Sequence, residues 1–151
     1  MNRMRQAVLV CGLAATALAV ASTAAFQKKF PLPGPPTKEE VERGRYLVEE
    51  VAKCSECHTP RKPNGELDEQ AWLQGAPIWI RPVANIQPWA DRAPALAGLP
   101  SFTDEQIEKV LEQGTGPNGE PLRAPMHIYH INHQDAKAIV AYLKSLPRPI
   151  R

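Results

Sequence analysis

Residues 54–58 read Cys54-Ser55-Glu56-Cys57-His58, and this stretch decides how the rest of the sequence is interpreted. Two thiols three positions apart can each add to a vinyl group of a haem, and the histidine that follows offers its imidazole to the iron. The stretch therefore predicts one covalently attached haem c, bound through Cys54 and Cys57, with His58 as the first axial ligand.

Two other kinds of site also use a Cys-X-X-Cys pair. A thioredoxin-like redox disulfide follows a strand in a βαβ unit, whereas the residues before Cys54 predict a helix. A structural zinc site needs four ligands at a recognisable spacing, and no second cysteine pair follows Cys57. The sequence favours the haem interpretation over both.

The second axial ligand of a haem iron comes from far along the chain, as a thioether or a second imidazole. Met126 is the only methionine beyond the N-terminal leader, and it lies in Arg123-Ala124-Pro125-Met126, between two predicted helices. We therefore predict that His58 and Met126 are the two metal ligands. Nearby imidazoles are the alternative sixth ligands (His127, His130 and His133), and an open sixth position would indicate a peroxidase or gas sensor.

The N-terminus has the pattern of an export signal. Arg3 and Arg5 precede an uncharged, alanine-rich run over residues 7–25, with small-residue cleavage options at its end. We expect residues 1–25 to be a signal peptide or, if the run is retained, an N-terminal membrane anchor. The domain is then periplasmic, either soluble after cleavage or anchored to the membrane.

The charge balance argues against a nucleic-acid partner. The chain has 18 Lys and Arg against 16 Asp and Glu, and the excess of two equals the two arginines of the leader. No basic cluster with interleaved aromatic residues occurs elsewhere, so we expect no binding of nucleic acid.

Proline-rich residues 26–36 predict an extended linker, and residues 37–151 the single domain that follows. Three capped helices are expected in that domain. The first begins at a Thr37–Glu40 capping box, with an apolar stripe of Val41, Leu47, Val48 and Val51. The second runs from a Thr103 cap to Gly114, and the third from an Asn132 cap to Pro147.

Residues 61–100 show little periodicity and many prolines, so they predict irregular structure apart from a turn or two near Leu67 to Leu73. So long a loop needs a surface to pack on, and a large flat cofactor supplies one. Within it, the Gly75 to Leu99 stretch contains indole and guanidinium donors that either bind haem propionates or cover the ring edge, with packing preferred (Trp79, Arg81 and Trp89).

The chain resembles the monohaem class I cytochromes c, especially the small cytochromes and cytochrome domains that accompany bacterial periplasmic dehydrogenases. The resemblance implies an all-α, cytochrome c-like fold with three main helices and long loops wrapped around one covalent haem. It also implies that the first and last helices cross at Gly44 and Tyr142. The residues that carry it lie in four stretches (Gly44-Arg45-Tyr46-Leu47, Cys54 to Pro60, Ala124-Pro125-Met126 and residues 135–147).

These observations predict a single-electron carrier in an extracytoplasmic electron-transfer chain, without catalytic residues of its own. Its partners are expected to be redox proteins: a dehydrogenase, an oxidase or another cytochrome. Three alternatives stay open at this point: a haem subunit of a periplasmic dehydrogenase complex, a haem enzyme or sensor with an open or His-ligated sixth position, and an exported thiol or metal module without haem.

Overall fold

The computed structural model describes residues 34–85 and 88–149. The predicted leader, and the predicted linker up to residue 33, lie outside the described residues. Among those described, no helix is both long and apolar enough to cross a membrane. The elements are α2 (Lys38–Tyr46), the π-helix η1 (Leu47–Val51), α3 (Ser55–His58), the 3-10 helix η2 (Glu69–Ala71), β1 (Ala76–Pro77), β2 (Arg92–Ala93), α4 (Asp104–Gln113) and α5 (His133–Ser145).

Each of the three predicted helices begins at its predicted cap. The Thr37 hydroxyl accepts from the Glu40 amide at 3.2 Å, and the Glu40 carboxylate accepts from the Thr37 amide at 2.7 Å. A second capping box starts α4 at Thr103, and the Asn132 side chain caps α5. These side chains satisfy amides that have no partner within the first helical turn.

The π-helix η1 continues α2 toward Cys54 and changes which residues face the core. Leu47 and Val48 are buried as predicted, but Val51 is 57% exposed, so its assignment to the apolar stripe was wrong. A π turn is wider than an α turn. The residues of η1 therefore do not follow the 3.6-residue period from which the apolar stripe was predicted.

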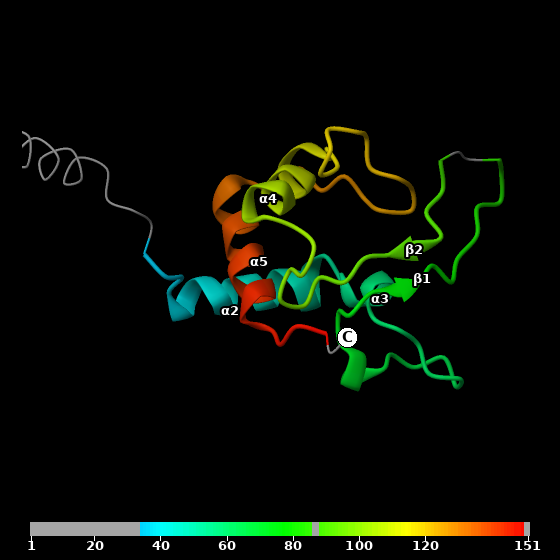
Figure 1. The fold of residues 1–151 in the computed structure, drawn as a ribbon, viewed down its shortest axis with the longest axis horizontal. Coiled ribbons are helices and arrows are strands. Elements are labelled where there is room, and N and C mark those ends of the chain that lie inside the picture. The colour runs from blue at the N-terminus through cyan, green and yellow to red at the C-terminus, as the bar shows by residue number, and fades with distance from the viewer. Residues whose placement is uncertain (1–33, 86–87, 150–151) are drawn as a thin grey trace, which may run out of the picture. The chain divides into compact units, whose positions relative to one another are not determined.

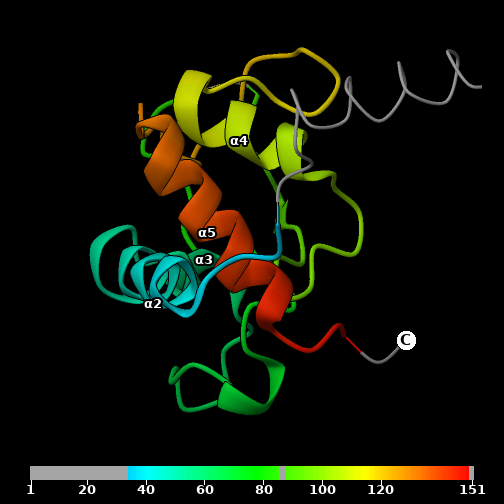
Figure 2. The same cartoon turned by 90° about the vertical axis from the view of Figure 1, so that its left-hand side faces the viewer.

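The first and last helices cross at Gly44, with almost no space between their backbones. A Cβ added to Gly44 would lie 1.9 Å from the Ala138 carbonyl oxygen and 2.8 Å from the Cβ of Tyr142. Figures 1 and 2 show α5 crossing α2. The crossing at Gly44 and Tyr142 that the family resemblance implied is confirmed.

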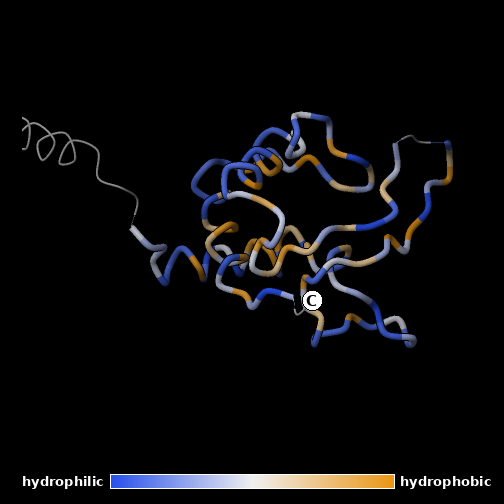
Figure 3. The backbone as a smooth tube through the Cα atoms, viewed as in Figure 1, coloured by the Kyte–Doolittle hydropathy of each residue, from blue (hydrophilic) through white to orange (hydrophobic). Residues whose placement is uncertain are grey.

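The core lies where α2, η1, α4 and α5 meet, and apolar segments of the loop between residues 72 and 99 close it. Figure 3 shows hydrophobic backbone segments at this junction, with hydrophilic ones on the outer turns. The most deeply buried large side chains include three that come from the loop, η1 and α5 (Leu73, Val48 and Ile139). Apart from the small sheet described next, this is the fold of three main helices and long loops that was predicted.

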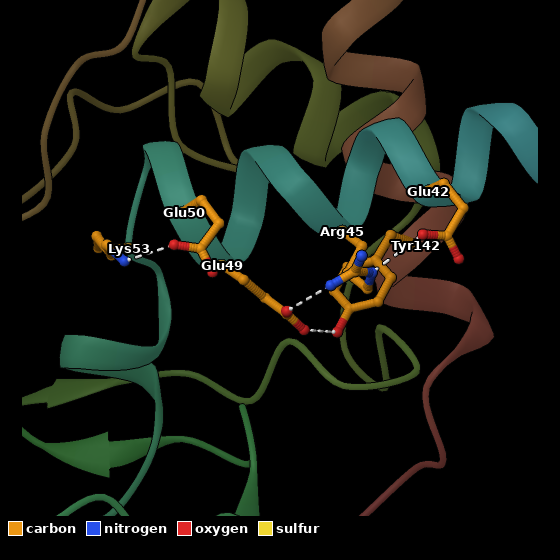
Figure 4. Close-up of polar contacts among 6 residues, drawn as sticks. All are labelled: Glu42, Arg45, Glu49, Glu50, Lys53 and Tyr142. Atoms are coloured by element: carbon orange, nitrogen blue, oxygen red, sulfur yellow. Dashed lines mark hydrogen bonds and ion pairs between the residues drawn. The ribbon is translucent and has the colours of Figure 1, made fainter.

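Polar side chains fasten η1 to α5 on the outside of the crossing (Figure 4). The Tyr142 hydroxyl donates to the Glu49 carboxylate at 2.5 Å, and Arg45 pairs with both Glu42 and Glu49. Burial, together with the hydrogen bond to Glu49, raises the pKa of Tyr142 to about 12. The hydroxyl therefore stays a donor at neutral pH.

The strands β1 and β2 were not predicted. They pair antiparallel over two residues each, Ala76 with Ala93 and Pro77 with Arg92. Beyond the two strands, the described residues up to position 85 and from position 88 extend away from the helices (Figure 1). Apart from this pair and η2, the described part of residues 61–100 lacks helices and strands, as expected.

We expect Gly44→Ala to destabilise the domain, because the new methyl group would clash with the Ala138 carbonyl. The cost should be about 1–3 kcal/mol, as for other overpacked contacts, despite the better helix propensity of alanine. Urea unfolding of the two proteins measures it. Gly34→Ala is the matched control, since its Cβ would meet nothing within 4 Å; equal losses in both variants would contradict the packing argument.

The ion pair between Arg43 and Asp135 joins α2 to α5 and should make stability depend on pH. The hydrogen bond from Arg43, at 2.9 Å, holds the pKa of the Asp135 carboxyl below its ordinary value. A depressed pKa contributes stability above the ordinary carboxyl pKa of about 4, and this is lost as pH falls through the folded value.

Asp135→Asn should therefore lower the free energy of unfolding slightly at about pH 7, and the difference from the wild type should shrink toward about pH 2. Urea unfolding across this range checks it. Glu105→Gln removes a first-turn carboxylate of α4 instead. Because Glu105 has no ion pair among the described residues, a pH-dependent loss of the same size there would refute the role of Arg43.

Candidate functional site

A cavity of about 750 Å³ lies beside α3 and is lined by residues from the turn before it, the long loop, α4 and the segment after α4. The volume is typical of sites that bind cofactor-sized ligands. The residues that the sequence singled out border this one cavity: Cys54, Cys57, His58 and Met126.

The His58 imidazole is buried, and its orientation is fixed by a backbone carbonyl. Its Nδ1 lies 2.8 Å from the Pro94 oxygen. Because a carbonyl can only accept, Nδ1 carries the proton and Nε2 keeps its lone pair for a metal. Burial lowers the pKa of His58, against the opposing effect of the Pro94 carbonyl, and so favours the neutral, ligating form.

The thiols of Cys54 and Cys57 are free and partly buried. Lys53, at φ +49°, turns the chain after η1, and the single helical turn of α3 then presents both thiols and the imidazole to the cavity. Burial raises the pKa of Cys54 to about 11, and burial with the nearby Glu56 charge raises that of Cys57. Both thiols are therefore neutral at pH 7, and they line the same cavity as the His58 imidazole.

The candidates for the sixth ligand separate into two groups. Met126 and His127 line the cavity. His130 is exposed and does not line it, and His133, the first residue of α5, pairs with Glu112 at 2.8 Å. The structure therefore brings Met126 and His127 to the site and leaves His130 and His133 outside it.

The segment that carries Met126 is attached to the long loop. The Ala90 amide donates to the Ala124 carbonyl at 2.7 Å, and Trp89 and Ala124 form an isolated parallel β-bridge. The Trp89 indole nitrogen is buried and has no hydrogen-bond partner among the described residues.

The other two donors proposed for propionates are engaged elsewhere. The Trp79 indole donates to the Glu56 carbonyl at 3.3 Å, and the Arg61 guanidinium stacks on its ring at 4.7 Å. Arg81 lies 3.7 Å from Asp91 at the surface. Trp79 thus binds α3 from outside the cavity, which agrees with the prediction that it serves packing and does not bind a propionate.

Sequence reasoning missed two residues at the site, Gly75 and Tyr129. The Gly75 amide donates to the His58 carbonyl at 2.8 Å. Gly75 has a φ of +81°, and a Cβ added to it would lie within 3.0 Å of backbone atoms of Ala93, Pro94 and Ala95. The Tyr129 ring lines the cavity, and burial raises its pKa to about 12. A glycine after the predicted turn was the only sequence signal for Gly75, and none marked Tyr129.

Residues 41–147 match the cytochrome c family, and the chain belongs to this family of haem-dependent electron-transfer domains. A cytochrome c domain implies haem c, and the spacing of Cys54, Cys57 and His58 fits the attachment motif. The neutral His58 with Nε2 unprotonated, the two thiols and the cavity fit this group.

Several dehydrogenase subunits are similar to the chain. The cytochrome subunit of fructose dehydrogenase from Gluconobacter japonicus is 36% identical over 112 residues, which is 70% of this chain and 22% of the relative. A diheme cytochrome c-type protein from Cereibacter sphaeroides is 35% identical, over 72% of this chain and 36% of the relative. The cytochrome c subunit of quinone alcohol dehydrogenase from Gluconobacter oxydans is 34% identical, over 72% and 24%. The chain thus matches about a third or less of each relative's length.

We expect Gly75→Ala to reduce the yield of haem-loaded protein and its stability. A Cβ at Gly75 would lie 2.8 Å from the Ala95 amide nitrogen and would push the Pro94 carbonyl away from His58. Gly65→Ala is the control, because Gly65 has a similar φ of +88° but no atom within 4 Å of its added Cβ. The control should lose about 1 kcal/mol from backbone strain alone, and Gly75→Ala about 1–3 kcal/mol more. Haem absorbance per protein and urea unfolding measure both; equal effects would contradict the close contact.

Proposed function

We propose that this protein carries single electrons on one covalent haem c, attached through Cys54 and Cys57 and ligated by His58 and Met126. The observation that supports this best is the shared cavity, which His58 and Met126 both line. The Pro94 carbonyl holds the His58 imidazole in the orientation and tautomer that leave Nε2 available for the iron. Methionine and histidine together are the ligand pair of high-potential c-type cytochromes.

The chain's own residues contribute orientation and burial. When bound, the haem supplies a reversible one-electron change at its iron. The Pro94 carbonyl keeps the His58 ring in one orientation and one tautomer, and the apolar walls, including Ile78, Leu96 and Ile107, limit the access of water. Ala90 holds the Met126 segment through Ala124. A site fixed in this way needs little rearrangement when the iron changes its charge.

The competing proposals differ in the sixth position and in the partner. His127 is the imidazole that borders the cavity together with His58, so it is the histidine that could replace Met126. An open position would instead suit a haem enzyme or sensor. The similarity to dehydrogenase cytochrome subunits supports a dehydrogenase as the electron donor, with an oxidase or another cytochrome as acceptor, and a role as subunit of such a complex.

We further propose the organisation that the sequence predicted. Residues 1–25 act as a signal peptide or an N-terminal anchor, residues 26–36 as a linker, and residues 37–151 as the cytochrome domain. The charged and then apolar pattern of the leader is that of an export signal, and it therefore supports a periplasmic location for the domain.

The test is a pyridine haemochrome spectrum together with the native ferric spectrum, on protein made with the cytochrome maturation machinery. We expect a c-type haemochrome and a methionine-to-iron charge-transfer band. Met126→Ala should abolish this band while covalent haem is retained, and His127→Ala should keep it. Covalent haem without the band would favour histidine or open ligation, and absence of haem would refute the proposal.

A further inference from the structure

We propose that Tyr129 is a positioning residue, which holds Met126 at the haem by fastening its segment to the backbone that leads into Cys54. This inference rests on the proposed ligation by Met126. It assigns to Tyr129 the task of keeping the sixth position closed, which is the property that separates an electron carrier from a ligand-binding haem protein.

The contact joins two parts of the chain that are 77 residues apart. The Tyr129 hydroxyl donates to the Ala52 carbonyl at 3.1 Å. Tyr129 lies three residues after Met126, and Ala52 lies two residues before Cys54. Both line the cavity, so the hydrogen bond spans its edge from the side of the sixth ligand to the side of the attachment motif.

The segment around Met126 has few other attachments. Its entry is held by the hydrogen bond between Ala90 and Ala124, and its exit by that from the Ile131 amide to the Leu111 carbonyl, at 3.1 Å. Between these two points, residues 125–130 make two hydrogen bonds to described residues outside that stretch. The Met126 amide donates to the nearby Arg123 carbonyl at 3.1 Å, and the Tyr129 hydroxyl donates to Ala52, so only the Tyr129 bond reaches a distant part of the chain. Without it, the stretch that carries Met126 would be tethered by hydrogen bonds only at its ends.

The acceptor, in contrast, belongs to a rigid part of the fold. Ala52 ends η1, and its amide donates to the Leu47 carbonyl at 2.8 Å. The Cys54 amide donates to the Val48 carbonyl, and both Leu47 and Val48 are buried in the core. Tyr129 therefore ties a weakly held segment to the helix that packs on α5.

An external ligand reaches a six-coordinate iron only when the internal ligand moves away. Loosening the Met126 segment should increase the fraction of time that Met126 is displaced, and apparent affinity rises with the population of the binding-competent state. The ferric protein with Tyr129→Phe should therefore bind imidazole about two- to tenfold more tightly than the wild type, which is the range expected for one lost hydrogen bond.

Tyr142→Phe is the matched control. Like that of Tyr129, the Tyr142 hydroxyl joins distant parts of the chain, but it donates to Glu49, and Tyr142 does not line the cavity. We expect this variant to lose stability in urea while its imidazole affinity stays within about twofold of the wild type. Equal gains in affinity for both variants would show that general loosening is the cause, and would overturn the proposal.

A double variant tests whether Tyr129 acts through Met126. In a Met126→Ala background no methionine competes with imidazole, so adding Tyr129→Phe should leave the affinity unchanged. A gain that persists in this background would indicate a direct effect of the ring on the cavity and would also overturn the proposal.

The result can be separated from the fate of the proposed function. The charge-transfer band of the wild type tests ligation by Met126 on its own, and its absence would overturn both proposals. If the band is present and Tyr129→Phe binds imidazole like the wild type, only the role of Tyr129 fails.

Discussion

The contact between Gly44 and the backbone of Ala138 fixes the path of the chain into the site. Because no side chain separates the two helices there, α2 can occupy only a narrow range of positions on α5. The π-helix η1 continues α2, buries Leu47 and Val48, and delivers Cys54 to the edge of the cavity. The attachment motif is thus held by a helix that is itself fixed on the C-terminal helix, and its position depends little on the exposed loops.

The opposite walls of the cavity come from irregular segments that are joined at a few backbone groups. The His58 ring binds the Pro94 carbonyl, the Gly75 amide binds the His58 carbonyl, and the Ala90 amide binds the Ala124 carbonyl. Each bond links segments that are distant in the sequence. A loop as long as this one is unusual without a functional reason. Here its backbone supplies the groups that orient the two sides of the site.

Signals confined to one helical turn were readable from the residues themselves. Long-range contacts were not, apart from the helix crossing at Gly44 and Tyr142, which the family resemblance implied. Thr37, Thr103 and Asn132 cap helices because the amides they satisfy lie within three residues. The strands β1 and β2 contain two residues each, too few to show a period, and Val51 leaves the core through a π turn that the α period cannot anticipate. In the site, Cys54, Cys57 and His58 lie within five consecutive residues, and Met126 was predicted because it is the only methionine beyond the leader. The Pro94 carbonyl, as a backbone group 36 residues from His58, left no side-chain signal.

The pairing of α2 with α5 has a consequence for how such a domain can be joined to others. Among the described residues, the first and last helices of the domain, α2 and α5, pack on one another (Figures 1 and 2). A unit closed in this way can be placed in series along a longer polypeptide without opening its core. The relatives, of which this chain matches 22% to 36%, have lengths that leave room for such serial arrangement. In such an arrangement the contact between α2 and α5 lies within each unit, so a neighbouring unit does not need to contribute side chains to its core.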